Sequence, residues 1–140
     1  MTDKILRLPQ LGLTDLNLEY FSYTAQHGEK LLQAVSSMTD STLLALNLGG
    51  NLRWWRNESC FSLLFEVLQN QEHLRDLHLG GSEFTSEQTE ELLRTISEAE
   101  MLQSLATLNL WRSANFSSDE SVSLLALILA KAQNLKQVDI

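Results

Sequence analysis

One arrangement of hydrophobic and polar positions occurs five times along this 140-residue chain. Each copy has the spacing apolar-x-x-apolar-x-apolar, and the copies are Leu13-Leu16-Leu18, Leu43-Leu46-Leu48, Leu74-Leu77-Leu79, Leu105-Leu108-Leu110 and Leu135-Val138-Ile140. Their middle apolar residues stand at positions 16, 46, 77, 108 and 138, so successive copies are 30, 31, 31 and 30 residues apart. A fixed period in this range indicates one structural unit that is copied along an axis.

The third copy shows what one unit contains. Residues 74–79, LRDLHL, alternate apolar and other side chains with a period of two, which predicts a half-buried strand. Paired glycines follow and interrupt regular structure. Thr85 and Ser86 then precede acidic and amide residues, a pattern typical of a helix N-terminus. The predicted helix has one apolar stripe, formed by Leu92, Leu93, Ile96 and Ala99.

The other copies predict the same strand followed by the same kind of helix. We expect helices over 29–38, over 59–69 and from 119 onward. Their predicted apolar stripes are Leu31, Leu32, Val35 and Met38, then Phe61, Leu64, Phe65 and Leu68, then Val122, Leu125, Ile128, Leu129 and Ala132. Helical crossovers make successive strands parallel. Apolar strand faces and apolar helix stripes are then expected to bury one another.

These residues resemble the leucine-rich-repeat family, over essentially positions 13 to 140. The family pattern LxxLxLxxN/CxL is matched through its first nine positions by LLALNLGGN, Leu43 to Asn51. Ser82 and Ser113 stand where Asn or Cys is usual, which is expected to weaken the ladder of bonds to the backbone after the strand. The interval of 30 to 31 residues resembles the ribonuclease-inhibitor-like class.

The resemblance implies an α/β leucine-rich-repeat solenoid, a short right-handed β-α superhelix. Five parallel strands would form one sheet on the concave side, with about four helices on the convex side. The whole chain, 1–140, is expected to be a single domain with repeats starting near 13, 43, 74, 105 and 135. Residues 1–12 are a candidate N-terminal cap, because a terminal repeat otherwise exposes its core.

The strand positions between the leucines point away from the core by alternation. One row across the predicted sheet is Asp15, Ala45, Asp76, Thr107 and Gln137, and the next is Asn17, Asn47, His78, Asn109 and Asp139. The resemblance implies that this concave face binds a protein partner. The predicted partner-binding residues, in these rows and just beyond them, are Asp15, Asn17, Glu19, Tyr20, Asn47, Asp76, His78, Asn109, Trp111 and Arg112.

Two glycine pairs, 49–50 and 80–81, stand just past the strands and between larger residues. Glu19 and Tyr20 precede them in the series, and Trp111 and Arg112 follow. We hypothesise a shallow notch over the glycines that receives a loop or helix of a partner, since Tyr, Trp and Arg often dominate binding energy. The alternative is that the glycines only serve tight turns after the strands.

The remaining aromatic residues are divided between core and surface. Tyr23, Phe84 and Phe116 fall near the apolar loop position of their units and are expected in the core. Of Trp54 and Trp55, one is expected in the core and the other exposed, as a second candidate anchor for a partner.

Composition narrows the classes of partner. The formal charge of −8 argues against a nucleic-acid backbone, which requires clustered Lys and Arg, and against an anionic membrane surface. The longest apolar run, 124–130, is too short to cross a bilayer. Cys60 is the single cysteine, which excludes an internal disulfide and fits a reducing, cytoplasmic location.

No chemistry of catalysis or cofactor binding is predicted. Asp76 and His78 share a strand face, and Ser82 is close in sequence, but no further residue completes a catalytic or metal site. A phosphate-binding glycine loop is also missing from the sequence. We therefore expect neither an enzyme nor a bound cofactor or metal.

Two classes of function stay open. The first is a non-catalytic module that binds a protein on the concave face. The alternative is a structural or assembly component, or a fragment of a longer repeat array, that acts through an open C-terminal edge at Ile140. That edge is also a candidate for self-association, although five strands can also suffice as they are.

Overall fold

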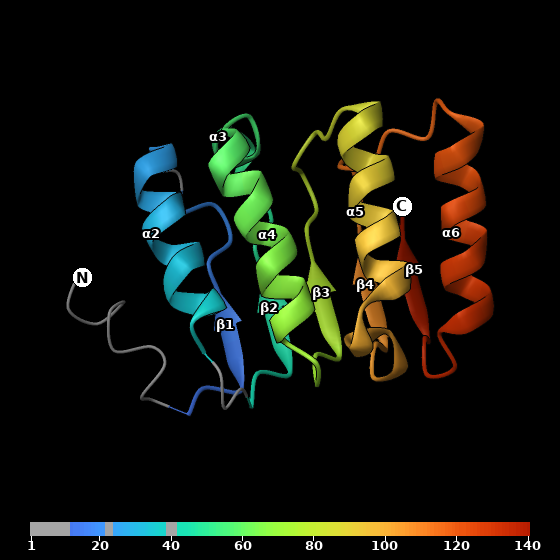
Figure 1. Cartoon of the computed structure of the whole chain (residues 1–140), viewed down its shortest axis with the longest axis horizontal. Coiled ribbons are helices and arrows are strands. Elements are labelled where there is room, and N and C mark those ends of the chain that lie inside the picture. The colour runs from blue at the N-terminus through green and yellow to red at the C-terminus, as the bar shows by residue number, and fades with distance from the viewer. Residues whose placement is uncertain (1–11, 22–23, 39–41) are drawn as a thin grey trace.

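The computed structural model describes residues 12–21, 24–38 and 42–140, and these form an α/β fold with a five-stranded parallel sheet (Figure 1). The strands lie in sequence order and are β1 (Asp15–Asn17), β2 (Ala45–Asn47), β3 (Asp76–His78), β4 (Thr107–Asn109) and β5 (Gln137–Asp139). Their register aligns the residues that the pattern predicts, such as Leu16 with Leu46 and Leu77 with Leu108. The candidate cap up to residue 11 and Tyr23 lie outside the described residues.

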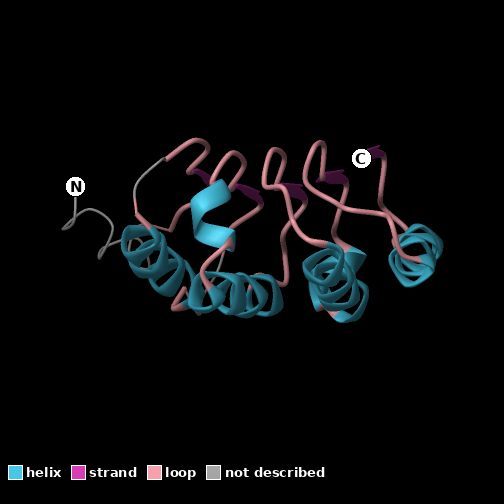
Figure 2. Cartoon of the chain, turned by 90° about the horizontal axis from the view of Figure 1, so that it is seen from above, coloured by secondary structure: helices cyan, strands magenta, loops and turns pink. Residues whose placement is uncertain are grey.

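Among the described residues, four longer helices cover one side of the sheet and leave the other side open (Figure 2). They are α2 (Ala25–Ser36), α4 (Glu58–Asn70), α5 (Ser86–Glu98) and α6 (Asp119–Lys131), and the 3-10 helix η2 (Glu100–Gln103) follows α5. A side chain caps the start of each longer helix by accepting a backbone N–H, and the caps are Thr24, Asn57, Thr85 and Ser118. Thr85 and Gln88 complete a capping box.

The leucines of the repeated pattern form the core between sheet and helices. In the three middle copies every one of these leucines is fully buried. In the first and last copies burial is partial, and Ile140 is 59% exposed. This difference follows from position, because within the described residues β1 and β5 each have a neighbouring strand on one side only.

The expectation that one of the two adjacent tryptophans is exposed is wrong. A short helix that the pattern did not predict, α3 (Leu52–Trp55), turns both Trp54 and Trp55 inward, and both are buried. The Trp54 ring lies against Gly28 of α2, where no side chain intervenes. The Trp55 Nε1 donates a hydrogen bond of 3.0 Å to the Ser82 hydroxyl. Each ring therefore has its own place in the core.

The predicted stripe of α6 is also partly wrong. Ile128 and Ala132 are buried as expected, but Val122 and Leu129 are each more than half exposed. Helix α6 packs against α5 on one flank, and the described residues place no further helix on the other flank (Figure 1). The apolar side chains on that outer flank consequently remain in contact with solvent.

The longest α-helices within the described residues have 13 residues. None of the described helices has the length and apolar character that crossing a membrane requires.

Candidate functional site

The open face of the sheet has a hollow of about 450 Å³ at the position where the sequence predicts a notch. Its floor is formed by the two glycine pairs, 49–50 and 80–81, with side chains from β2, β3 and β4 beside them. The residues that line it are Glu19, Tyr20, Asn47, Gly49, Gly50, Leu52, His78, Gly80, Gly81, Glu83, Asn109, Trp111 and Arg112.

Most of the predicted partner-binding residues meet in this hollow. Asp15 and Asn17 of β1 and Asp76 of β3 do not line it. Leu52 and Glu83 line it without having been predicted. Leu52 is the first residue of the unpredicted helix α3, and Glu83 has a positive φ of 50°, which the sequence pattern does not indicate.

A left-handed backbone position follows every strand from β1 to β4. The φ values are 51° at Tyr20, 70° at Gly50, 72° at Gly81 and 56° at Arg112. Glycine adopts this conformation without a steric penalty, whereas other residues pay roughly 1–2 kcal/mol for it. The turn interpretation of the glycines is therefore supported, and the same glycines leave the floor of the hollow without side chains.

The two walls of the hollow are aromatic and exposed. Tyr20 is 68% exposed and Trp111 is 55% exposed. The Tyr20 ring leans over Gly50, so closely that a Cβ atom at Gly50 would lie 2.3 Å from it. On the opposite wall the Arg112 guanidinium stacks 4.5 Å from the centre of the Trp111 ring, a cation–π contact that orients both side chains.

Asparagine side chains close the turns after three of the strands. The backbone N–H of the residue two positions later donates to the side-chain oxygen of Asn17, Asn47 and Asn109, at 2.9, 3.0 and 2.9 Å. His78 occupies the aligned position in β3, between Asn47 and Asn109 in the sheet. The series is therefore interrupted at the centre of the hollow.

The residues beneath the turns are buried and satisfied. Asn51 is buried, and its amide donates to the carbonyls of Leu18 and Leu48, both at 2.9 Å. At the corresponding places Ser82 donates to the Leu79 carbonyl, and the Ser82 N–H donates to the Ser113 hydroxyl. The serines thus continue the ladder of hydrogen bonds to the backbone, which the replacement of asparagine by serine was expected to weaken.

Ser82 does not join Asp76 and His78 in a catalytic arrangement. Its side chain is completely buried and directed into the core, whereas Asp76 and His78 are half-buried on the sheet face. Among the described residues no cluster of three or more His, Cys, Asp or Glu side chains is arranged to hold a metal ion.

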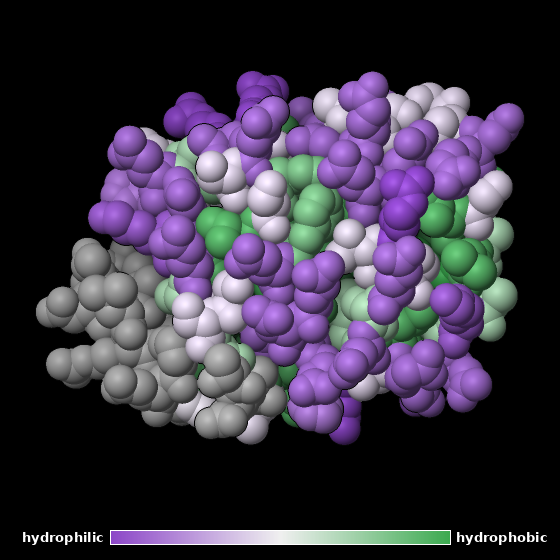
Figure 3. Space-filling view, in the orientation of Figure 1, coloured by the Kyte–Doolittle hydropathy of each residue, from purple (hydrophilic) through white to green (hydrophobic). Residues whose placement is uncertain are grey.

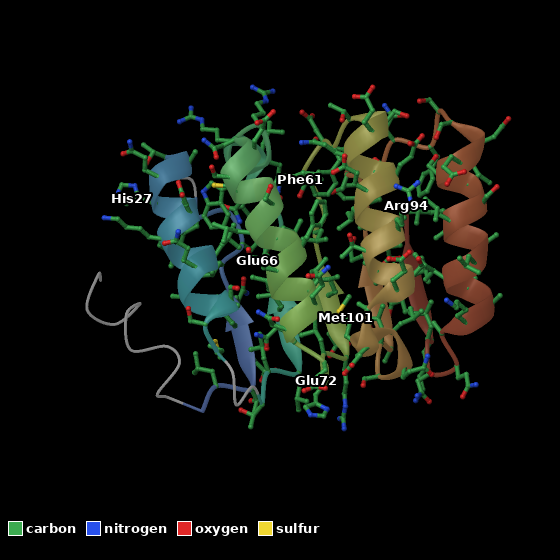
Figure 4. The ribbon with its side chains drawn as sticks, in the orientation of Figure 1. His27, Phe61, Glu66, Glu72, Arg94 and Met101 are labelled. Atoms are coloured by element: carbon green, nitrogen blue, oxygen red, sulfur yellow. The ribbon has the colours of Figure 1, made fainter. Side chains whose placement is uncertain are left out.

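The helix side of the molecule presents a different surface. It is mainly hydrophilic, with apolar areas between α4 and α5 and over α6 (Figure 3). Phe61 of α4 lies beside the apolar area between α4 and α5 (Figure 4). It lines a hollow of about 460 Å³ together with Phe65 and Glu91. Arg94 of α5 reaches Glu120 of α6 in an ion pair of 3.1 Å.

No family model matches the chain, and no curated protein is found to be similar to it. The function is therefore argued from the geometry of the site.

Proposed function

We propose that the chain is a leucine-rich-repeat solenoid of the ribonuclease-inhibitor-like kind, and that it is a non-catalytic module that binds a protein partner on its strand face. The proposal is supported by five copies of the leucine pattern and by five parallel strands in sequence order. The observation that carries it is the hollow between two exposed aromatic side chains, Tyr20 and Trp111.

This hollow has the composition of a binding surface. Burial of large exposed aromatic side chains by a partner stabilises the complex. Tyr, Trp and Arg are the residues that most often contribute more than about 2 kcal/mol to an interface. The stacking of Arg112 on Trp111 also limits the rotamer entropy that binding would remove. The wall formed by Trp111 and Arg112 is consequently arranged before a partner arrives.

The test is affinity capture with the immobilised wild-type chain and two variants. Trp111→Ala removes one wall, and Val122→Ala is the matched control, since Val122 is 53% exposed but lies on α6. We expect a protein that is retained by the wild type and by Val122→Ala and lost by Trp111→Ala, with unchanged far-ultraviolet circular dichroism. Identical retention by all three proteins would refute binding at the hollow.

A second candidate function is assembly through the end of the sheet. Val122, Leu129 and Ile140 are each more than half exposed, and they belong to the last helix and the end of the chain. A second copy that packs against α6 and pairs with β5 would bury them. Light scattering tests this candidate: a dimer that dissociates in Leu129→Glu supports it, and a monomeric wild type at high concentration rejects self-association.

A further inference from the structure

The centre of the hollow contains a backbone donor that the fold leaves without a side-chain partner. At the aligned turns, Glu19, Gly49 and Trp111 each donate their N–H to an asparagine two residues earlier. Gly80 has His78 at that place, and within the described residues no side chain accepts from the Gly80 N–H. An N–H group of this kind is strongly polar and favours an acceptor from a bound molecule.

The electrostatic surroundings select the kind of acceptor. The carboxylates of Glu19 and Glu83 line the hollow, and Asp76 lies on β3, one of the strands that contribute to its floor. The Glu19 carboxylate is held over the floor by the Asn47 amide, at 3.4 Å. Arg112 is the lining residue with a fixed positive charge, and its guanidinium is already stacked on Trp111.

A carboxylate or phosphate in the hollow would therefore meet several like charges. A peptide carbonyl accepts the same hydrogen bond and carries no net charge. Lys and Arg side chains beside that carbonyl would face Glu19 and Glu83 with favourable charge. The width between the aromatic walls is a few strand spacings, about 5 Å each, which suits an extended chain.

We propose that the hollow recognises an extended, basic peptide segment of the protein partner. A backbone carbonyl of the segment accepts a hydrogen bond from the Gly80 N–H, and Lys or Arg side chains of the segment lie against Glu19 and Glu83. His78 keeps this donor available because its ring, as the structure places it, does not accept the turn-closing bond that Asn17, Asn47 and Asn109 accept. The inference rests on the proposed function and specifies the chemistry of its partner.

The discriminating substitution is His78→Asn, which copies the residue of the neighbouring strands. It is expected to supply an internal acceptor to the Gly80 N–H, as Asn47 does for Gly49. His78→Ala is the matched control, because it also removes the ring but offers no acceptor. Position 78 is half-buried on the sheet surface, so both variants are expected to fold.

The probe is a displayed library of random 12-residue peptides, selected on the immobilised wild-type chain. Selected peptides are expected to be rich in Lys and Arg, to require Trp111 and to bind more weakly as salt concentration rises. We expect His78→Asn to lower their affinity about fivefold to tenfold, the loss of one hydrogen bond, and His78→Ala to lower it less. In amide NMR spectra the Gly80 resonance should shift when the peptide binds the wild type.

The outcomes distinguish a failure of this inference from a failure of the proposed function. Peptides that require Trp111 but are acidic or uncharged, or that bind wild type and His78→Asn equally, overturn this inference and leave the proposed function standing. An unshifted Gly80 resonance in the complex also overturns it. A selection that yields no Trp111-dependent peptide counts against the proposed function and against this inference together.

Discussion

Gly28→Ala is a test of packing, because it is expected to destabilise the protein, whereas glycine-to-alanine substitutions in helices usually stabilise. Replacing glycine by alanine inside a helix usually stabilises it, by about 1 kcal/mol. Gly28 is buried in α2 with the Trp54 ring against it, and a Cβ atom there would lie 2.7 Å from three ring atoms. Such a distance is too short for carbon atoms, so either the ring or the helix must move.

The ring has little room to move. Trp54 is fully buried, and the rings of Trp55 and Phe21 lie 5.9 and 6.4 Å from it, centre to centre. We place the cost in the upper part of the range of about 1–3 kcal/mol for overpacking. After the gain in helix propensity is subtracted, Gly28→Ala should destabilise the protein by about 1–2 kcal/mol.

Urea unfolding followed by far-ultraviolet circular dichroism measures this effect. With a slope of about 2 kcal/mol per molar urea, the midpoint should fall by about 0.5–1 M. Gln26→Ala, at an exposed position of the same helix, is the control and should leave the midpoint nearly unchanged.

Repeating Gly28→Ala in a Trp54→Phe variant tests whether the contact between residue 28 and the Trp54 ring causes the loss. Trp54→Phe shortens the ring and removes an Nε1 that has no hydrogen-bond partner among the described residues. In that background Gly28→Ala should become neutral or stabilising, which a double-mutant cycle would record as a coupling energy. A higher midpoint for Gly28→Ala alone, or an equal loss in both backgrounds, would refute the reasoning.

Three further predictions concern single side chains. Ser82→Ala should destabilise the protein by about 1–3 kcal/mol, because it leaves the buried Trp55 Nε1 without its acceptor, and Ser62→Ala on the exposed side of α4 is the control in the same urea assay. Burial, and secondly the Glu29 carboxylate, raise the pKa of the Cys60 thiol from 9.0 to about 11. The stabilisation from keeping this thiol neutral is thus complete below pH 9.0 and lost as the pH rises to about 11, so across that window the urea midpoint should fall more in the wild type than in Cys60→Ala; equal slopes would contradict this. Arg94→Ala should cost less than about 1 kcal/mol, and less still at high salt, because the ion pair with Glu120 is exposed to solvent on both sides.

The strands and their register could be predicted because one leucine pattern defines both. A period of two marks the buried face, and the regular interval aligns equivalent residues across the sheet. Helix starts were predictable where a hydroxyl cap precedes a continuous apolar stripe, as at Thr85 and Ser118. Helix α2 starts at Ala25, four residues before the predicted start at 29, because Thr24 caps it there. Gly28 consequently lies inside the helix. In the sequence, a glycine at this position suggests an interruption of the helix, and the close contact with the Trp54 ring explains its presence inside α2.

The walls and the glycine floor of the hollow were predictable from the sequence, whereas the contributions of Leu52 and Glu83 were not. The glycine pairs indicate a notch because glycine has no side chain, whereas the residues at the equivalent positions on both sides are large. The position of Trp54 and Trp55 was not predictable, because two adjacent aromatic residues in a loop point the same way only when a local helix turns them. The exposed flank of α6 depends on which neighbours surround the helix, and this is a property of the tertiary structure.

The turns that end the strands join the stability of the fold to the character of the hollow. A left-handed residue is required after each strand from β1 to β4, and at Gly50 and Gly81 glycine meets this requirement without strain. Tyr20 and Arg112 meet it at a conformational cost, and in return they project exposed side chains at the two margins of the bare floor. A chain under pressure for stability alone would place glycine or asparagine at all four positions. Strain retained at the two margins, with an asparagine replaced by His78 between them, is more readily explained by binding than by folding.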